Sequence, residues 1–125
     1  MGKVSLFVVG QYIEAFNIAT GQNLPCGSIY QSTGLQAHIQ KRHATELSNL
    51  DRISEVIAHP DYVGRNPTEV NSIELVKVFD ENILVCIKLD TKAGYLYVSS
   101  VYPIRESKLR NRLNSGRLRS IKDFL

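Results

Sequence analysis

The chain has few cysteines and no long hydrophobic run, and each lack excludes a class of protein. Its two cysteines, Cys26 and Cys86, lie far apart and carry no pairing motif, so we expect reduced, structural thiols and not a disulfide framework. No apolar run approaches the roughly 20 residues that a membrane-spanning helix needs. The start of the chain has one cation and no small-residue cleavage pattern. We therefore expect a strand from Val4 to Val9, not a signal peptide.

Several catalytic motifs are also missing. The chain has no Gly-rich phosphate loop and no Gly-x-Ser-x-Gly nucleophile elbow, which argues against a nucleotide-hydrolysing or dinucleotide enzyme and against that type of serine hydrolase. Asp61, Glu74 and Asp80 do not have the spacing of metal ligands, and no histidine or cysteine cluster suggests zinc. The sequence therefore predicts neither a metal site nor a cofactor.

What the chain does have is an uneven distribution of charge. Its 125 residues predict one domain, from 1 to 125, with an ordinary apolar content of 43%. Residues 1–104 carry 8 Lys or Arg and 10 Asp or Glu, a net charge of −2. Residues 105–125 carry 7 Lys or Arg and 2 Asp or Glu, a net charge of +5. This basic C-terminal segment is either a solvated amphipathic helix or an arm that contacts phosphate groups.

Apolar spacing predicts helices in the first half of the chain. One helix is expected over residues 11–19 with Gly21 as its stop, and another from Ser48 to His59, whose apolar stripe contains Ile53, Val56 and Ile57. The proline after His59 ends the second helix, so we expect a capping or packing role for that histidine. Residues 28–30 form a short extended piece, and residues 60–67 have the composition of a structured loop.

The second half predicts three strands and a final helix. The strands are expected over residues 73–79, 83–89 and 95–102, joined by short turns into an antiparallel meander. A helix over residues 106–113 follows, and residues 117–119 can add a last extended piece. Helices first and a meander afterwards indicate the α+β class. Strict alternation along the strands predicts one face that holds Glu74, Val76, Leu84, Cys86, Lys88, Leu96, Val98, Ser100 and Tyr102.

The stretch from Gly34 to His43 concentrates groups suited to phosphate chemistry. Ser32 or Thr33 can cap a helix that begins here, and Leu35 and Ile39 would face the core. His38 and Arg42 form a second i,i+4 pair with Lys41 beside them. Imidazole transfers protons near neutral pH, while Arg and Lys neutralise phosphate charge. The alternative is an ordinary surface helix with solvated charges.

Several motifs along the chain together resemble a known family. They are the stretch Gly34–His43, the loop Pro60–Pro67, the segments Asn71–Lys77 and Tyr95–Tyr102, and the C-terminal run from Lys108 to Leu118. In order and spacing they resemble the phage-associated branch of the barnase/EndoU/colicin/RelE-like (BECR) nucleases over residues 25–119. The resemblance implies N-terminal helices packed on an antiparallel meander of about four strands.

The resemblance also implies an activity and partners. It implies a toxin-like endoribonuclease that needs no metal and cuts RNA, with tRNA as one possible target, to leave a 2′,3′-cyclic phosphate. An antitoxin or immunity protein is expected as a partner, and a membrane is not. The expected location is the cytoplasm, for a protein encoded by a bacterium or a phage, or a target cytoplasm into which the protein is delivered.

Specific residues can be matched to this chemistry. His43, at the C-terminal end of its helix, is the first choice for proton transfer because the helix dipole favours its protonated form, and His38 is the second. The two lie about 140° apart round an ideal helix, so both reach one phosphate only if the helix ends or bends near Arg42. Ser100 and Tyr102 on the last strand would complete the catalytic set with Arg42. Lys41, Lys108, Arg112 and Arg117 are the expected RNA-binding residues.

Two other functions fit the same sequence. The chain could be a non-catalytic RNA- or DNA-binding module that uses its basic tail, or a protein–protein module that binds an acidic partner. A steep salt dependence of binding would suit both the nuclease and the nucleic-acid-binding module. Cleavage lost on replacement of His43 or His38, with binding retained, separates those two.

Overall fold

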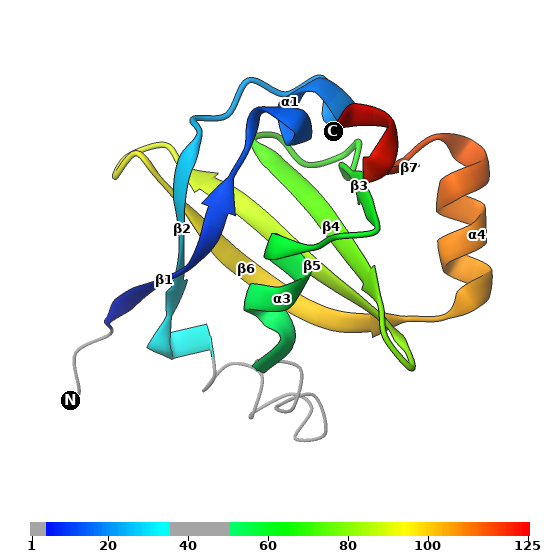
Figure 1. The fold of residues 1–125 in the computed structure, drawn as a ribbon. Helices are drawn as coiled ribbons and strands as arrows, with labels where there is room; N and C mark the ends of the chain where they lie inside the picture. Colours follow the sequence, from blue (N-terminus) through cyan, green and yellow to red (C-terminus); the bar gives the residue numbers. More distant parts are fainter. Residues whose placement is uncertain (1–4, 36–50) are drawn as a thin grey trace.

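A computed structural model describes residues 5–35 and 51–125 and confirms the α+β class (Figure 1). In chain order its elements are β1 (Leu6–Tyr12), α1 (Glu14–Thr20), β2 (Gly27–Ser32), α3 (Ile53–Ala58), β3 (Tyr62–Gly64), β4 (Ser72–Val78), β5 (Asn82–Asp90), β6 (Tyr95–Ile104), α4 (Glu106–Ser115), β7 (Leu118–Ser120) and the 3-10 helix η2 (Ile121–Phe124). No helix in the described part of the chain is long and apolar enough to cross a bilayer.

All the strands join one mixed sheet, which is larger than the predicted meander. Its order is β1-β2-β6-β5-β4-β3-β7. The predicted meander is present as β4, β5 and β6, which pair antiparallel. The expectation of about four antiparallel strands is wrong, because the sheet already has seven strands within residues 5–35 and 51–125, and β2 runs parallel to β6. The short strands β3 and β7 extend the sheet beyond β4.

The main core lies on the face of the sheet that α3 covers (Figure 1). The predicted stripe of Ile53, Val56 and Ile57 is buried there, at most 2% exposed. Gly10 of β1 passes so close to α3 that an added Cβ would meet the side chain of Ile57. The placement of the helices differs from the prediction: α1 packs at the β3 end of the sheet, against β3 and η2, and the C-terminal helix α4 packs on the opposite face from α3.

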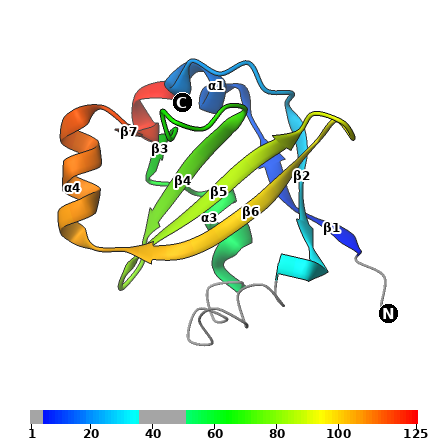
Figure 2. The ribbon, with the colours of Figure 1, turned by 180° about the vertical axis from the view of Figure 1, so that it is seen from behind.

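A smaller core lies on the opposite face, under α4. It contains Val76, Leu84, Ile104, Leu109 and Leu118. Seen from behind, α4 stands beside the sheet, and no described helix crosses in front of the middle of β4, β5 and β6 (Figure 2). We call this uncovered middle part the open face. The fold therefore leaves a surface where partly exposed polar side chains of β5 and β6 can meet a ligand, whereas Ser72 and Glu74 of β4 are buried beneath it.

A β-bulge in β6 decides which side chains reach the open face. Cys86 pairs with Ser100 but Ile87 pairs with Val98, so Ser99 is the extra residue. The prediction from strict alternation is consequently wrong for the first half of β6. Leu96 and Val98 are buried in the main core, and Tyr95 and Tyr97, opposite Asp90 and Lys88, share the open face with Ser100 and Tyr102.

Other local predictions can be compared with the structure element by element. Residues 33–35 are helical, the Ser32 hydroxyl accepts a hydrogen bond from the Gly34 N–H at 2.9 Å, and Leu35 is buried as expected. The first predicted helix begins later than expected, since β1 continues to Tyr12. Its stop is confirmed, because Gly21 ends α1 in the left-handed conformation at φ 73°.

Residues 60–67 are not only a loop. They contain β3, which pairs with β4 on one side and β7 on the other. His59 is the residue that ends α3, as predicted, and its carbonyl oxygen accepts a hydrogen bond from Lys77 Nζ at 3.1 Å.

Candidate functional site

A buried carboxylate lies at the centre of the candidate site. Glu74 sits in the middle of β4, between Ile73 and Leu75, whose side chains point into the main core. Alternation turns Glu74 to the opposite side of the sheet, where its side chain is only 3% exposed. A carboxylate so far removed from water is stable only with cationic partners.

Two arginines from the C-terminal segment supply that partnership. Arg112 Nη1 donates to Glu74 Oε2 at 3.0 Å. Arg117 forms a two-pronged pair, with Nε donating to Oε1 at 2.8 Å and Nη2 to Oε2 at 3.1 Å. Such charge-assisted, bidentate hydrogen bonds are among the strongest that proteins make. The hydrogen bond to Glu74 raises the pKa of the Arg117 guanidinium above its ordinary value. The cluster holds two cations and one anion, so it keeps a net positive charge.

The end of α4 explains why both arginines reach one carboxylate. Gly116 ends the helix in the left-handed conformation at φ 82°, which a glycine adopts without strain. The Ser115 hydroxyl accepts a hydrogen bond from the Arg117 N–H at 3.3 Å. The chain then enters β7, which pairs with β3. Arg112 on the helix and Arg117 after it thus approach β4 from two directions.

Ser100, Tyr102 and Cys86 lie next to this cluster on the open face. Ser100 is the cross-strand partner of Cys86, which in turn pairs with Glu74, and Tyr102 is the partner of Leu84. Burial raises the pKa of the Tyr102 phenol, and Arg112 beside it acts in the opposite direction. Burial likewise raises the pKa of the Cys86 thiol, against the effect of the Ser100 hydroxyl. Both groups are therefore protonated near neutral pH and available as hydrogen-bond donors.

Three tyrosines form the far end of the open face. Tyr30 of β2 and Tyr95 of β6 meet edge to face with ring centroids 5.7 Å apart, and Tyr95 meets Tyr97 at 6.2 Å. Between these rings and Glu74, Lys88 Nζ pairs with Glu69 Oε2 at 2.9 Å. Half-buried aromatic rings beside cationic groups are suited to stacking nucleic-acid bases.

The predicted site residues divide into three groups. Ser100, Tyr102, Arg112 and Arg117 are gathered by the fold within one region. Lys108 is exposed on α4, and its expected role in RNA binding stays a prediction. His38, Lys41, Arg42 and His43 lie outside the described residues, so their expected roles stay predictions as well.

The sequence prediction missed the part played by Glu74. It placed Glu74 on the same face as Ser100 and Tyr102 but gave it no role. Its arginine partners stand 38 and 43 residues further along the chain. One signal was available, since a lone acid within the apolar run from Ile73 to Val76 must be paired if that strand is buried.

The arrangement is suited to binding and polarising a phosphate. Guanidinium groups neutralise phosphoryl oxygens and donate to them in pairs, and hydroxyl groups add neutral donors. Within residues 5–35 and 51–125, no group of three or more His, Cys, Asp or Glu side chains is placed to hold a metal ion. The groups that the described site offers include the guanidinium groups of Arg112 and Arg117, the hydroxyl groups of Ser100 and Tyr102, the Cys86 thiol and the Glu74 carboxylate.

Comparison with known proteins assigns the family. Residues 7–111 match the model of the phage-Barnase-EndoU-ColicinE5/D-RelE like nuclease 3 family. The match includes Glu74, Ser100 and Tyr102, and ends one residue before Arg112. No match is found among curated proteins or among solved structures. The predicted resemblance is confirmed by this match, and the chain belongs to the phage-associated BECR nucleases of this third family.

Proposed function

We propose that the protein is a metal-independent endoribonuclease whose active site is the cluster of Glu74, Arg112 and Arg117 with Ser100 and Tyr102. The nuclease family supports cleavage of nucleic acid. The observation that carries the choice of site is the pair of arginines fixed by Glu74 on the open face. Cations held rigidly before the substrate arrives stabilise transition-state charge without reorganisation.

The reaction that suits these groups is transesterification. A base takes the proton of the ribose 2′-hydroxyl, the 2′-oxygen bonds to phosphorus, and the bond from phosphorus to the 5′-oxygen breaks. An acid then protonates that 5′-oxygen, which leaves a 2′,3′-cyclic phosphate and a 5′-hydroxyl. Arg112 and Arg117 neutralise the charge that develops on the phosphoryl oxygens, and the Tyr102 hydroxyl donates a further hydrogen bond to them.

Proton transfer is the remaining requirement of the reaction. Glu74 holds the two arginines in place and is the carboxylate nearest to the phosphate they would bind. His38 and His43 remain the histidines that the sequence nominates. A carboxylate base and an imidazole base titrate in different pH ranges. The pH dependence of cleavage, measured for a His38→Ala/His43→Ala variant and for Glu74→Gln, therefore identifies which group supplies each limb of the profile.

The first test is cleavage of total tRNA in excess EDTA, with the ends of the fragments analysed for cyclic phosphate. We expect cyclic ends, and no cleavage of an oligonucleotide that carries a single 2′-deoxyribose at the cut site. Arg112→Gln should lower the rate about 10²-fold, the effect of losing one donor to transition-state charge. Arg110→Gln, the same change on the exposed side of α4, is the matched control and should cleave like the wild type.

Three results would contradict the proposal. They are cleavage that stops in EDTA, cleavage of the 2′-deoxy substrate, and equal rates for Arg112→Gln and Arg110→Gln. Tight RNA binding without cleavage would instead favour the non-catalytic nucleic-acid-binding module.

A further inference from the structure

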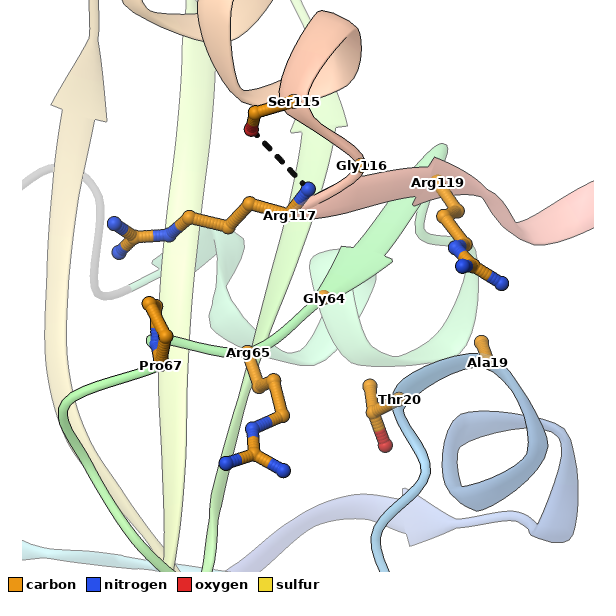
Figure 3. Close-up of a pocket in the computed structure, with 9 residues that line it drawn as sticks. All are labelled: Ala19, Thr20, Gly64, Arg65, Pro67, Ser115, Gly116, Arg117 and Arg119. Carbon is orange, nitrogen blue, oxygen red and sulfur yellow. Dashed lines mark hydrogen bonds between the residues drawn. The ribbon is translucent and has the colours of Figure 1, made fainter.

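A second basic site adjoins the candidate active site at the β3–β7 end of the sheet. It is a cavity of about 490 Å³ whose lining includes Thr20, Gly64, Arg65, Arg117 and Arg119 (Figure 3). The described residues that line it include three arginines and no acidic residue. Among the described residues, Arg65 and Arg119 form no ion pair, whereas Arg117 pairs with Glu74. The charge of this cavity is therefore not balanced from within.

The pairing of β3 with β7 brings together the backbone that carries these arginines, since Arg119 lies in β7 and Arg65 directly follows β3. Val63 pairs with Arg119, and Gly64 pairs with Leu118. An added Cβ at Gly64 would overlap the carbonyl oxygen of Arg117, so only glycine allows the two strands to approach this closely. Figure 3 shows Arg65 and Arg119 extending to either side of Thr20, while the side chain of Arg117 turns the opposite way. Arg117 thus stands between the cavity and the carboxylate of Glu74.

A second cavity of similar size has the opposite charge. It has about 510 Å³ and lies at the opposite end of α4, lined by Asp80, Glu81 and Glu106 together with Arg105. Its three carboxylates repel an anion, although the volume of this cavity is no smaller than that of the first. The two cavities differ in charge and not in size, which makes Arg105 a suitable position for a control.

We propose that the cavity beside Arg65 and Arg119 holds a backbone phosphate of the RNA strand, next to the phosphate that Arg112 and Arg117 bind. This inference rests on the proposed function, since it assigns a second contact of the same substrate. The guanidinium groups of Arg65, which follows β3, and of Arg119 in β7 can donate in pairs to phosphate oxygens. Arg117 borders both the cavity and the proposed active site. A continuous RNA strand therefore passes from one to the other. The second contact binds substrate and transition state alike.

The test compares two double variants with the same loss of charge, Arg65→Gln/Arg119→Gln and the control Arg105→Gln/Arg110→Gln. Binding of a single-stranded 2′-O-methyl oligoribonucleotide, which has no free 2′-hydroxyl, is measured by anisotropy at several salt concentrations. One lost phosphate contact lowers the magnitude of the salt slope by about 0.7 on single strands. We expect that decrease, with a several-fold weaker affinity, for the first variant beyond any change in the control. On a cleavable RNA the same variant should raise KM and leave kcat unchanged.

The outcomes separate this inference from the proposed function. If the wild type does not cleave but the slopes differ as expected, the phosphate site stands and the catalytic proposal fails. If the wild type cleaves and the two double variants bind alike, the phosphate site is overturned. A wild type that binds no RNA also overturns it. The last alternative is a site for a small free anion, which is tested by titrating inorganic phosphate and following the arginine Nε–H resonances. If phosphate shifts the resonances of Arg65 and Arg119 and added RNA does not displace it, the cavity binds a small free anion. That result would overturn the proposal.

Discussion

At the scale of single residues, Glu74 and the pair of Arg110 with Glu106 show how burial changes the cost of losing an ion pair. Glu74 carries a buried charge whose two partners are mostly buried themselves, with side-chain exposures of 12% for Arg112 and 24% for Arg117. The surface pair of Arg110 and Glu106 is the natural contrast, since both its side chains are more than half exposed. Loss of one partner is costly in the Glu74 cluster because the remaining charge stays buried, away from water. It costs little in the surface pair, because water solvates the remaining charge.

Replacement of Glu74 by Gln should therefore destabilise the protein strongly. We expect a loss of about 3 kcal/mol in the free energy of unfolding, because two arginines lose their counter-charge in a dry environment. Urea denaturation measures it, and Glu106→Gln is the control, with an expected change of at most about 0.5 kcal/mol. The double variant Glu74→Gln/Arg112→Gln should lose less than the sum of the two single variants. Strict additivity would mean that the buried pair is not coupled.

The residue scale also shows how far the sequence predicts the site. Ser100, Tyr102, Arg112 and Arg117 could be nominated from the sequence because hydroxyl groups and cations of this kind are what phosphate chemistry needs, and their roles stay predictions. Their geometry could not be predicted, because it depends on a carboxylate from another strand and on a turn at Gly116. The contact between Glu74 and Arg117 joins positions 43 residues apart, and a local pattern contains no information about such a pair.

At the scale of the elements, length and regularity decide what was predictable. The long strands β4, β5 and β6 alternate clearly enough to be predicted close to their observed bounds. The strand β3 has three residues and two neighbouring strands, so it exists through pairing and not through its own pattern. The alternation of polar and apolar residues does not predict the bulge at Ser99 either, and this bulge places Tyr95 and Tyr97 on the open face.

The close approach of β3 and β7 leads to a prediction at Gly64. A Gly64→Ala variant must push the two strands apart, because the new Cβ has backbone atoms in its way and not a flexible side chain. We expect a loss of about 3 kcal/mol, at the upper end for overpacking, together with weaker RNA binding as Arg117 and Arg119 shift.

A control for this variant is available in the β5–β6 turn. Gly94 has φ 80° and nothing within 4 Å of an added Cβ, so Gly94→Ala should cost only about 1 kcal/mol of left-handed strain. Thermal unfolding and RNA affinity distinguish the two variants. A Gly64→Ala protein as stable as Gly94→Ala would show that the strands can separate freely.

At the scale of the whole molecule, the C-terminal segment is part of the fold and not an appended arm. Its net charge of +5 suggested either a solvated helix or a phosphate-binding arm, and the structure shows a helix that also buries apolar side chains. Leu109 and Leu118 complete the smaller core, and Ile121 belongs to the main core. The basic residues are thus attached to an element that both cores require.

Removal of residues 112–125 should therefore destabilise the rest of the domain. Loss of the buried side chains of Leu118 and Ile121 alone removes roughly 3–6 kcal/mol of burial energy, and Val76 and Leu84 become exposed. We expect a lower thermal midpoint and binding of a hydrophobic dye by the shortened chain. An Arg112→Gln/Arg117→Gln variant of the full chain is the control that removes charge and keeps the apolar contacts. A shortened chain as stable as this control would contradict the assigned role of the segment.

The dependence of the cluster on residues far along the chain has a consequence for the timing of synthesis. Glu74 is added to the growing chain 43 residues before Arg117. At typical rates of translation this interval lasts about 2–9 s. Glu74 lacks both of its cations until Arg112 is added, and the cluster is complete only when Arg117 follows, so a shorter nascent chain has no finished phosphate site. The proposed activity would begin only once translation has passed Arg117. An unfinished chain would therefore not cleave RNA near the ribosome that is making it.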